Sequence, residues 1–127
     1  MKKGTKYILV IIVIGVIGLI IYQASGDRTV EPSKYDDFAK CLTEKGVVMY
    51  GAYWCPHCAN QKKLFGDSWQ YVTYVECDAR GDNANPDLCK SKGVSGYPTW
   101  IFADGTRASK VLTLTELSVR SSCALPQ

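Results

Sequence analysis

The chain has 127 residues, of which 46% are hydrophobic and 21% charged, and its formal net charge is +3. That length suits one folded domain with terminal segments around it. The positive excess comes from Lys2, Lys3 and Lys6, because 12 basic and 12 acidic residues remain once these are set aside. A main body without net charge argues against nucleic-acid binding and against a strongly acidic substrate.

A charge-free apolar run, Tyr7 to Tyr22, follows the lysines. It is shorter than the roughly 20 residues of an untilted membrane span, although residues 23–25 can extend it. Cleavage as a signal peptide is one interpretation, because Ala24-Ser25-Gly26 supplies small residues. The density of Ile and Val, with a tyrosine at each end, favours a retained transmembrane signal anchor at residues 7–24.

The charges around this run predict its orientation. Three lysines precede it, so residues 1–6 are expected to stay in the cytoplasm and the rest of the chain to lie outside, in a periplasm, a lumen or the cell exterior. Six cysteines in a small domain agree with an oxidising compartment, where disulfides persist. Residues 25–32 are expected to form a linker, and residues 33–123 the folded domain.

The domain is expected to alternate helices and strands. Ser33 is a suitable N-cap for the first helix and Gly46 a suitable stop. The strand after it is almost wholly apolar, which is typical of a strand covered on both faces. The expected elements are a helix at 34–44, a strand at 47–53, a helix at 56–65, a strand of undecided direction at 71–77, a short helix at 86–92, a hairpin of strands at 100–103 and 107–112, and a helix from Thr113 or Thr115 to about Ser121.

The motif Trp54-Cys55-Pro56-His57-Cys58 places two thiols one helical turn apart, where a strand becomes a helix. Pro56 suits the first helical turn, because its missing N–H is no loss there. Cys55 then lies at the helix N-terminus, where unpaired N–H groups and the helix dipole stabilise a thiolate, while Cys58 is drawn inward. The pattern predicts a redox site with Cys55 as nucleophile and Cys58 as resolving thiol.

A structural disulfide and half of a zinc site are the alternative interpretations of this pair. A structural zinc site usually has a second closely spaced ligand pair, and the other four cysteines are widely scattered. His57, the only histidine, lies between the two thiols rather than at a ligand spacing outside them. We therefore expect neither a metal nor another cofactor.

A second motif, Gly96-Tyr97-Pro98-Thr99-Trp100, begins 38 residues after Cys58 and leads into an apolar strand. Together, WCPHC after one strand and GYPT before another resemble the thioredoxin superfamily over about residues 33–123. The runs MYGAYWCPHC, KKLFG, YVEC and LCKSKGVSGYPTW are similar to the thioredoxin-like domain associated with vitamin K epoxide reductase homologues. The Pro-His dipeptide is similar to that of periplasmic Dsb-type oxidants.

The resemblance implies a fold and a site. The fold is a thioredoxin-like α/β fold, a central mixed sheet flanked by helices, here preceded by one N-terminal transmembrane helix. The resemblance also implies that Pro98 is cis and faces the two thiols. The expected catalytic residues are Cys55, Cys58, His57 and Pro98, and the expected substrate-binding residues are Trp54, Pro56, Gly96, Tyr97 and Thr99.

The chain departs from the family pattern at Met49. Thioredoxins, disulfide isomerases and Dsb-type oxidants commonly carry a buried acid six residues before the first cysteine, and Met49 occupies that position. The group that deprotonates Cys58 is therefore not identified by the sequence. Of the other prominent side chains, Trp69, Tyr71 and Tyr74 are expected to pack in the core, and Lys62 and Lys63 to form a solvated helix face.

The remaining four cysteines leave several interpretations open. Cys77 and Cys89 flank a loop rich in Asp, Asn and Gly, where a structural disulfide would stabilise the fold by about 3 kcal/mol. A second redox pair and two free thiols are the alternatives there. Cys41 and Cys123 have only each other as partners, but the helices that carry them usually cover opposite sheet faces in a thioredoxin fold, so a second disulfide and free thiols both stay open.

These observations predict a membrane-anchored, extracytoplasmic thiol-disulfide oxidoreductase that oxidises cysteine-containing substrate proteins. The resemblance implies re-oxidation by a quinone-linked membrane partner of the vitamin K epoxide reductase or Dsb type. The oxidising direction rests on His57 and Pro56 together with the helix N-terminus, which all act on the Cys55 thiolate and favour the reduced form. The alternatives are a tethered reductase, an isomerase or chaperone, and a non-enzymatic extracellular binding domain held together by disulfides.

Overall fold

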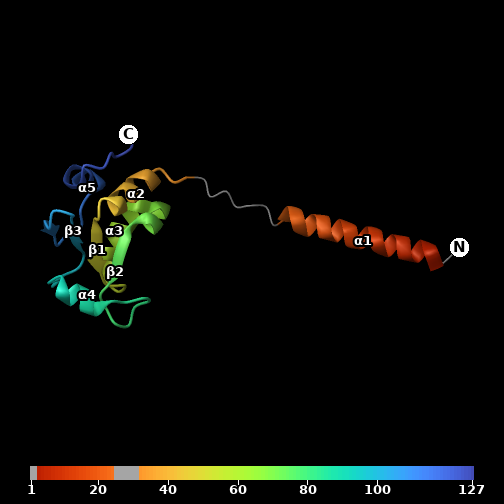
Figure 1. The fold of residues 1–127 in the computed structure, drawn as a ribbon, viewed down its shortest axis with the longest axis horizontal. Coiled ribbons are helices and arrows are strands. Elements are labelled where there is room, and N and C mark those ends of the chain that lie inside the picture. Colours follow the sequence, from red (N-terminus) through yellow and green to blue (C-terminus); the bar gives the residue numbers. More distant parts are fainter. Residues whose placement is uncertain (1–2, 25–31) are drawn as a thin grey trace. The chain divides into compact units, whose positions relative to one another are not determined.

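The computed structural model describes residues 3–24 and 32–127 (Figure 1). The chain divides into two units, Met1–Glu31 and a domain that spans Pro32–Gln127. The linker expected at residues 25–32 lies outside the described residues, apart from Pro32 itself. The two units are therefore described separately.

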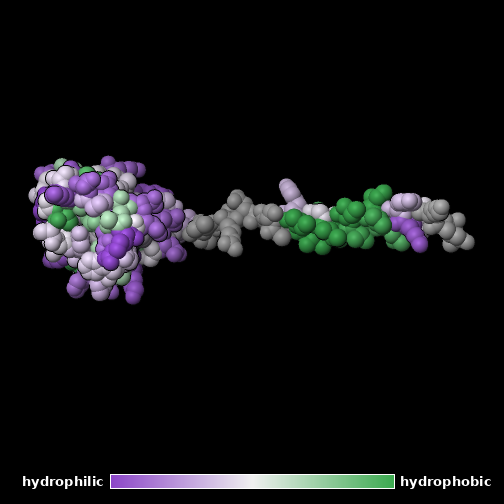
Figure 2. All heavy atoms as spheres, turned by 90° about the horizontal axis from the view of Figure 1, so that it is seen from below, coloured by the Kyte–Doolittle hydropathy of each residue, from purple (hydrophilic) through white to green (hydrophobic). Residues whose placement is uncertain are grey.

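The first unit is a single helix, α1, at Lys3–Ala24. Within it, Gly4–Gln23 is a stretch of 20 residues with a mean hydropathy of 2.5, long and apolar enough to cross a membrane by length and composition. Figure 2 shows its side chains as an almost continuous hydrophobic surface. A helix that is apolar on all sides suits a lipid environment or a signal sequence better than water.

The domain is built on a four-stranded mixed sheet with strand order β2-β1-β3-β4. The central strand β1 (Val48–Gly51) pairs in parallel with β2 (Thr73–Glu76) and antiparallel with β3 (Thr99–Ile101). The edge strand β4 (Arg107–Ala108) pairs antiparallel with β3. This topology confirms the predicted thioredoxin-like α/β fold, and the direction of β2, which the sequence left undecided, is parallel to β1.

Four α-helices and one 3-10 helix surround the sheet. They are α2 (Asp36–Glu44), α3 (Pro56–Phe65), the 3-10 helix η1 (Gly66–Tyr71), α4 (Pro86–Ser91) and α5 (Leu114–Ser121). The bounds of α3 agree with the prediction, because Pro56 occupies the first turn and Gly66 ends the helix with a φ of 56°. Thr113, rather than Thr115, caps α5, in a capping box with Glu116.

The two faces of the sheet pack against different helices. Met49 and Trp100 share one hydrophobic cluster with residues of α2, α3 and α5, among them Phe38, Phe65 and Leu117. The other face forms a smaller cluster around β1 and α4: Tyr50, Cys77 and Cys89. Figure 1 shows α4 apart from the other helices of the domain.

The shared cluster corrects the expectation that the helices of Cys41 and Cys123 cover opposite faces. α2 and α5 pack on the same face, and Lys45, just after α2, donates to the backbone carbonyls of Ser121 and Ser122 at the end of α5, at 3.1 and 2.8 Å. The two cysteines are thereby brought together, and they form a disulfide with a Cα–Cα distance of 5.9 Å.

Most element boundaries differ from the expectation by one or more residues, and three differences are informative. Ser33 is not a side-chain N-cap of α2, which begins at Asp36; instead, the backbone N–H of Ser33 donates to the Asp36 carboxylate at 3.0 Å. The helix η1 follows α3 directly and includes Tyr71, which was expected to begin a strand. No element was expected at residues 66–70, because a short 3-10 turn has no apolar periodicity that the sequence would show. The predicted strand at 107–112 is shorter, since only Arg107–Ala108 pair with β3.

Candidate active site

Two free thiols lie where β1 leads into α3, and they are the free cysteines of the described chain, residues 3–24 and 32–127. Cys55 is the N-cap of α3, with extended backbone (φ −77°, ψ 119°), and its N–H donates to the carbonyl of Ala52 at 3.0 Å. Pro56 begins the helix, and Cys58 lies in its first turn. Both thiols are shielded from water, Cys55 at 6% exposure and Cys58 at 1%.

The surroundings of Cys58 disfavour its thiolate. Burial raises the pKa of the Cys58 thiol to about 12, and the neighbouring Cys55 adds to this rise. The charge of Lys62 acts in the opposite direction as a smaller effect. A reaction that uses the anion of Cys58 therefore needs a group that accepts the proton of this thiol.

The loop before β3 lies against the first thiol. The Cys55 thiol donates to the backbone carbonyl of Tyr97 at 3.7 Å, and the Tyr97–Pro98 peptide bond is cis. Next to this contact is a surface hollow with a volume of about 340 Å³, lined by His57, Tyr97, Pro98, Ser109, Lys110 and Val111. The structure thus brings His57 of the first motif and Pro98 of the second to one place.

Trp54 is held beside the site as an exposed aromatic surface. Its side chain is 54% exposed, and its indole N–H donates to the Asp78 carboxylate at 2.7 Å. Asp78 also accepts from Arg80, and these hydrogen bonds, first those of Arg80 and then that of Trp54, lower the pKa of Asp78 below its usual range. The ring of Trp54 meets that of Tyr97 edge-on at 6.2 Å between centroids.

The other predicted substrate-binding residues differ in their exposure to solvent. Thr99 is 1% exposed, and its hydroxyl donates to the Gly96 carbonyl at 2.7 Å and pairs with Ser109 at 3.0 Å. Its side chain is therefore closed to a substrate, because Thr99 already belongs to β3, and the expected substrate contact of Thr99 stays a prediction for its backbone. Gly96 is half-buried and accepts that bond, while Pro56 is exposed at the start of α3.

The second pair of expected bridging cysteines is also joined. Cys77 and Cys89 form a disulfide with a Cα–Cα distance of 5.8 Å, and both are buried beneath the loop that they close. Asp78, which holds Trp54, follows Cys77 directly. The disulfide therefore anchors one end of the loop that reaches the aromatic surface beside the thiols.

Gln61 is a buried polar residue that the sequence analysis did not identify. It is fully buried, its side-chain oxygen accepts from the Trp100 indole at 3.0 Å and from the Leu112 N–H at 2.8 Å, and its amide donates to the Leu112 carbonyl at 2.9 Å. These bonds tie α3 to β3 and to the segment before α5. A glutamine three residues after a cysteine gives no sequence signal for such a role.

The aromatic residues near the site pack in the core as expected, but Lys62 does not lie on the solvated helix face that was expected for it. Trp69, Tyr71 and Tyr74 all pack against the main core cluster. Lys63 is exposed, whereas Lys62 is half-buried, with its ammonium 4.0 Å from the centroid of the Tyr74 ring. Lys62 is therefore part of the thiol surroundings rather than of a solvated face.

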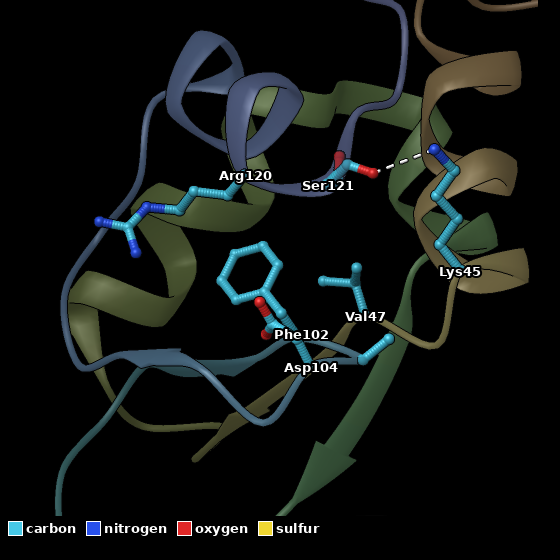
Figure 3. Close-up of a pocket in the computed structure, with 7 residues that line it drawn as sticks. Lys45, Val47, Phe102, Asp104, Arg120 and Ser121 are labelled. Atoms are coloured by element: carbon cyan, nitrogen blue, oxygen red, sulfur yellow. Dashed lines mark hydrogen bonds between the residues drawn. The ribbon is translucent and has the colours of Figure 1, made fainter.

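A second hollow, about 280 Å³ in volume, lies at the other end of the sheet (Figure 3). Val47 and Phe102 line its floor, Lys45 and Arg120 supply positive charge at its rim, and Asp104 supplies negative charge. Its lining contains no cysteine and no histidine. Within residues 3–24 and 32–127, no cluster of His, Cys, Asp or Glu side chains could hold a metal ion.

Comparisons with known proteins agree with this geometry. The family model described as thioredoxin matches residues 28–118. The thiol-disulfide oxidoreductase LTO1 of Arabidopsis thaliana is 36% identical over 93 residues, which are 70% of this chain and 24% of that protein. The protein disulfide-isomerase of Aspergillus niger is 29% identical over 98 residues, 72% of this chain and 18% of that protein. The chain thus spans about a quarter or less of the length of these relatives.

Among solved structures, thioredoxin O2 from Arabidopsis thaliana in its oxidised state superposes with a TM-score of 0.39 at 16% identity, covering 71% of this chain and 87% of that one. The family assignment rests on the family model, whose match covers well over half of the chain and includes both Cys55-Cys58 and the Pro98 loop. From the mixed sheet, the free thiol pair at the start of α3 and this match, we conclude that the chain belongs to the thioredoxin family.

Proposed function

We propose that this domain is a thiol-disulfide oxidoreductase that acts on cysteine-containing substrate proteins through Cys55 and Cys58. One observation carries the proposal: a free thiol at the N-cap of α3 lies beside a second free thiol, while the other four cysteines are joined in disulfides. The domain thus keeps one reactive pair apart from two structural pairs. The two named relatives, an oxidoreductase and a disulfide isomerase, support the same class of reaction.

The local geometry assigns different roles to the two thiols. Cys55, at the N-terminus of a ten-residue helix, faces unpaired N–H groups that stabilise its anion, so it is the nucleophile. Cys58 is more deeply buried and its thiolate is disfavoured, so it acts only on the disulfide that Cys55 has formed. His57, at the edge of the hollow beside Pro98, adds a cationic partner for Cys55 when protonated.

In the oxidising direction the site begins as the Cys55–Cys58 disulfide. A substrate thiolate attacks the sulfur of Cys55, a mixed disulfide forms, and Cys58 leaves as a thiolate that takes up a proton. A second substrate thiolate then attacks the substrate sulfur of the mixed disulfide and releases Cys55. The substrate has gained one disulfide and lost two electrons, and the site holds two thiols.

Repeated turnover needs an electron acceptor, and we propose a quinone-linked membrane protein of the vitamin K epoxide reductase or Dsb type. The proposal rests on the resemblance of the MYGAYWCPHC, KKLFG, YVEC and LCKSKGVSGYPTW segments to the domain associated with vitamin K epoxide reductase homologues, and of the Pro-His dipeptide to Dsb-type oxidants. We further propose that α1 remains as a membrane anchor with residues 1–6 in the cytoplasm and the domain outside. The apolar length of Gly4–Gln23 and the three lysines before Tyr7 support this placement. A shared membrane would raise the frequency of encounters between the two proteins.

The first experiment tests the assignment of the thiols. Cys55→Ser should abolish exchange with a protein substrate, while Cys58→Ala should accumulate a mixed disulfide that survives alkylation and non-reducing electrophoresis. Ser68→Ala is a suitable control for preparation effects, because Ser68 is buried away from both thiols and bonds to Asp36. Turnover retained by Cys55→Ser would refute the assignment of Cys55 as the nucleophile, whereas a wild-type chain without exchange activity would refute the proposed function and favour a structural or binding role.

The second experiment tests direction. Stabilisation of the Cys55 thiolate favours the reduced form, and about 30 mV corresponds to 1.4 kcal/mol for this couple. We expect a reduction potential above about −220 mV in glutathione buffers, with His57→Ala lowering it. Ser109→Ala, which alters an uncharged side chain of the same hollow, is the matched control. A potential near that of thioredoxin, about −270 mV, would favour a tethered reductase instead.

A further inference from the structure

The Cys58 thiol has to lose or gain a proton whenever the disulfide of the site closes or opens, yet the residue at the position of the family's buried acid cannot accept that proton. Met49 of β1, six residues before Cys55, is fully buried and carries no group that can accept a proton. The neighbouring strand β2 supplies two groups that can. Tyr74 and Glu76 lie on one face of that strand, and Glu76 is opposite Gly51 in the strand register.

Gly51 of β1 lies where strand β2 and the Cys58 thiol approach each other. A Cβ atom on Gly51 would lie 2.8 Å from the Cys58 sulfur, 3.0 Å from a ring carbon of Tyr74 and 3.3 Å from the Tyr74 hydroxyl. The sulfur and the hydroxyl therefore approach the same point of β1. Any side chain at position 51 would occupy the space between them, so glycine is what permits the approach.

Glu76 is held as a buried carboxylate behind Tyr74. It is 5% exposed, one oxygen accepts from the Tyr74 hydroxyl at 2.8 Å, and the other accepts from the Asp78 N–H at 2.9 Å. The loop after β2 folds over it so closely that a Cβ on Gly81 would lie 2.5 Å from the Glu76 side chain. A carboxylate shielded from water in this way is costly unless a specific role or set of donors retains it.

The charged and titratable groups around this pair come from α3 with its N-cap, from β2 and from the loop after β2, whose Asp78 and Arg80 pair with each other at 2.7 Å. The groups from α3 and β2 matter most for the proton. They are the Cys55 and Cys58 thiols, the ammonium of Lys62, which lies 4.0 Å from the centre of the Tyr74 ring, and the pair itself. Burial, followed by the hydrogen bond to Glu76, raises the pKa of Tyr74 well above its usual range. Tyr74 therefore stays neutral, able to pass a proton on but not to hold a negative charge.

We propose that Tyr74 and Glu76 together carry the proton of Cys58. When Cys58 attacks a mixed disulfide at Cys55, its proton moves to the Tyr74 oxygen while the Tyr74 proton moves to Glu76. The Cys58 thiolate, a neutral tyrosine and a neutral carboxylic acid result, and the Cys55–Cys58 disulfide then forms as the substrate leaves as a thiolate. In the oxidising direction the same transfer runs backwards, and the departing Cys58 thiolate takes the proton from Glu76 through Tyr74.

This inference rests on the proposed function, because it concerns the second thiol of the same exchange. The contact between the Cys58 sulfur and the Tyr74 hydroxyl forms in the step itself or through one water, as catalytic hydrogen bonds commonly tighten only then. Tyr74 is accordingly the group in contact with the reacting thiol, and Glu76 acts through it. The two residues come from a strand that has no cysteine motif of its own.

The test follows both thiols in one reaction. The reduced full-length chain, purified in detergent, is mixed with an aromatic disulfide reagent that releases a coloured thiolate, and release is followed by stopped flow from pH 6 to pH 10. The first, concentration-dependent phase reports attack by Cys55. The second phase does not depend on reagent concentration and reports attack by Cys58 on the mixed disulfide.

The informative variants are Glu76→Gln and Tyr74→Phe, which keep the shapes of the two side chains. Two matched controls exist. Asp36→Asn alters another buried carboxylate, which accepts a hydrogen bond from the Ser68 hydroxyl at 2.8 Å and is distant from both cysteines in the sequence. Tyr71→Phe alters another half-buried tyrosine. Thermal unfolding of each variant is recorded, and Tyr74→Phe decides the matter if Glu76→Gln fails to fold.

Both informative variants should slow the second phase roughly tenfold to hundredfold near neutral pH and leave the first within about twofold. The deficit should shrink as pH rises, since hydroxide can then take the Cys58 proton directly. A second phase with the wild-type rate and pH profile in both variants would overturn this inference alone, as would an equal loss in Asp36→Asn. A wild-type chain that releases no second coloured thiolate would overturn the proposed function as well.

Discussion

The free thiol pair and the Cys41–Cys123 disulfide lie at opposite ends of the sheet and use cysteine in opposite ways. At the site end, where β1 finishes, Cys55 and Cys58 are free thiols beside the Pro98 loop. At the far end, where β1 begins, Cys41 and Cys123 are joined and Lys45 bonds to the carbonyls that end α5. Each end has a surface hollow, but only the one at the site end is next to a free thiol.

This difference teaches that reactivity and mechanical stability are assigned to separate cysteine pairs of a very small domain. The disulfide at the far end connects segments 82 residues apart, so it restrains almost the whole domain. The thiols at the site end are three residues apart and restrain only one helical turn. Opening and closing the reactive pair can therefore proceed while the fold is held elsewhere. The predictions below test that separation, from the largest expected effect to the smallest.

The largest effect is expected on stability, from removal of the Cys41–Cys123 disulfide at the far end of the sheet. Replacing both Cys41 and Cys123 with Ser should lower the free energy of unfolding by about 4 to 5 kcal/mol, because the closed loop is long. Exchange by the folded protein should stay within about twofold of wild type. Denaturant unfolding without reductant, together with the initial rate of substrate oxidation, measures both quantities. A parallel loss of rate in fully folded protein would show that the two ends are coupled.

The second-largest loss of stability is expected for Gln61, which lies on the active-site helix α3 but bonds to residues of the core. Gln61→Leu leaves the Trp100 indole and the Leu112 backbone without their partner, so we expect a loss of about 2 to 4 kcal/mol in stability. Gln70→Leu is the matched control, because Gln70 is exposed and bonds only within its own turn. Thermal unfolding of the two variants compares them. Equal melting temperatures would contradict the proposed link between α3 and the core.

The third prediction concerns pH, and it applies to the site end alone because the cysteines of the far end do not titrate. Burial raises the pKa of Cys58 from 9.0 to about 12, so the fold favours the neutral thiol. Its contribution to stability is complete below pH 9 and is lost as the pH rises toward 12, by at most about 1.4 kcal/mol per pH unit.

Comparing Cys55→Ser with the double variant Cys55→Ser, Cys58→Ser isolates this thiol. The free energy of unfolding of the single variant should fall more steeply between pH 9 and pH 11 than that of the double variant. Identical slopes would mean that the Cys58 thiol is not held in its neutral form by the fold.

The smallest effect is expected at the aromatic surface beside the thiols. Asp78→Ala removes the hydrogen bond that orients Trp54, so the KM for a protein substrate should rise roughly two- to fivefold while exchange with a small thiol is unchanged. Asp82→Ala, an exposed change in the same loop, is the control. Steady-state kinetics with both substrate types distinguishes the outcomes, and an unchanged KM for the protein substrate would remove Trp54 from the docking surface.

Much of the fold was predictable because it depends on local chemistry. Pro56 and Gly66 mark the ends of α3 correctly, since one has a suitable φ for a first turn and the other adopts a positive φ. The motifs around Cys55 and Pro98 likewise indicate the thiol site without any structure. These signals lie within a few residues of the element that they define.

What the sequence did not reveal depends on contacts between elements. Tyr74 and Glu76 become neighbours of Cys58 only through the parallel register of β2 with β1, which the apolar pattern of β2 leaves open. The pairing of Cys41 with Cys123 depends on α2 and α5 sharing one face of the sheet. Ser33 is a residue type that is common at N-caps, but here the Asp36 carboxylate accepts a hydrogen bond from the Ser33 backbone, and the helix begins only at Asp36.

The loop between Cys77 and Cys89 also has a consequence for how such a domain can diversify. Its ends are fixed by the disulfide and by the bond from the Asn85 N–H to the Glu76 carbonyl, while residues 79, 80, 82 and 83 are exposed. Sequence change at Arg80, whose guanidinium pairs with the Asp78 carboxylate that holds Trp54, can alter the surface beside Trp54 without moving either thiol. Substrate preference could therefore drift between homologues, or be engineered, within one short surface segment while the exchange chemistry is inherited unchanged.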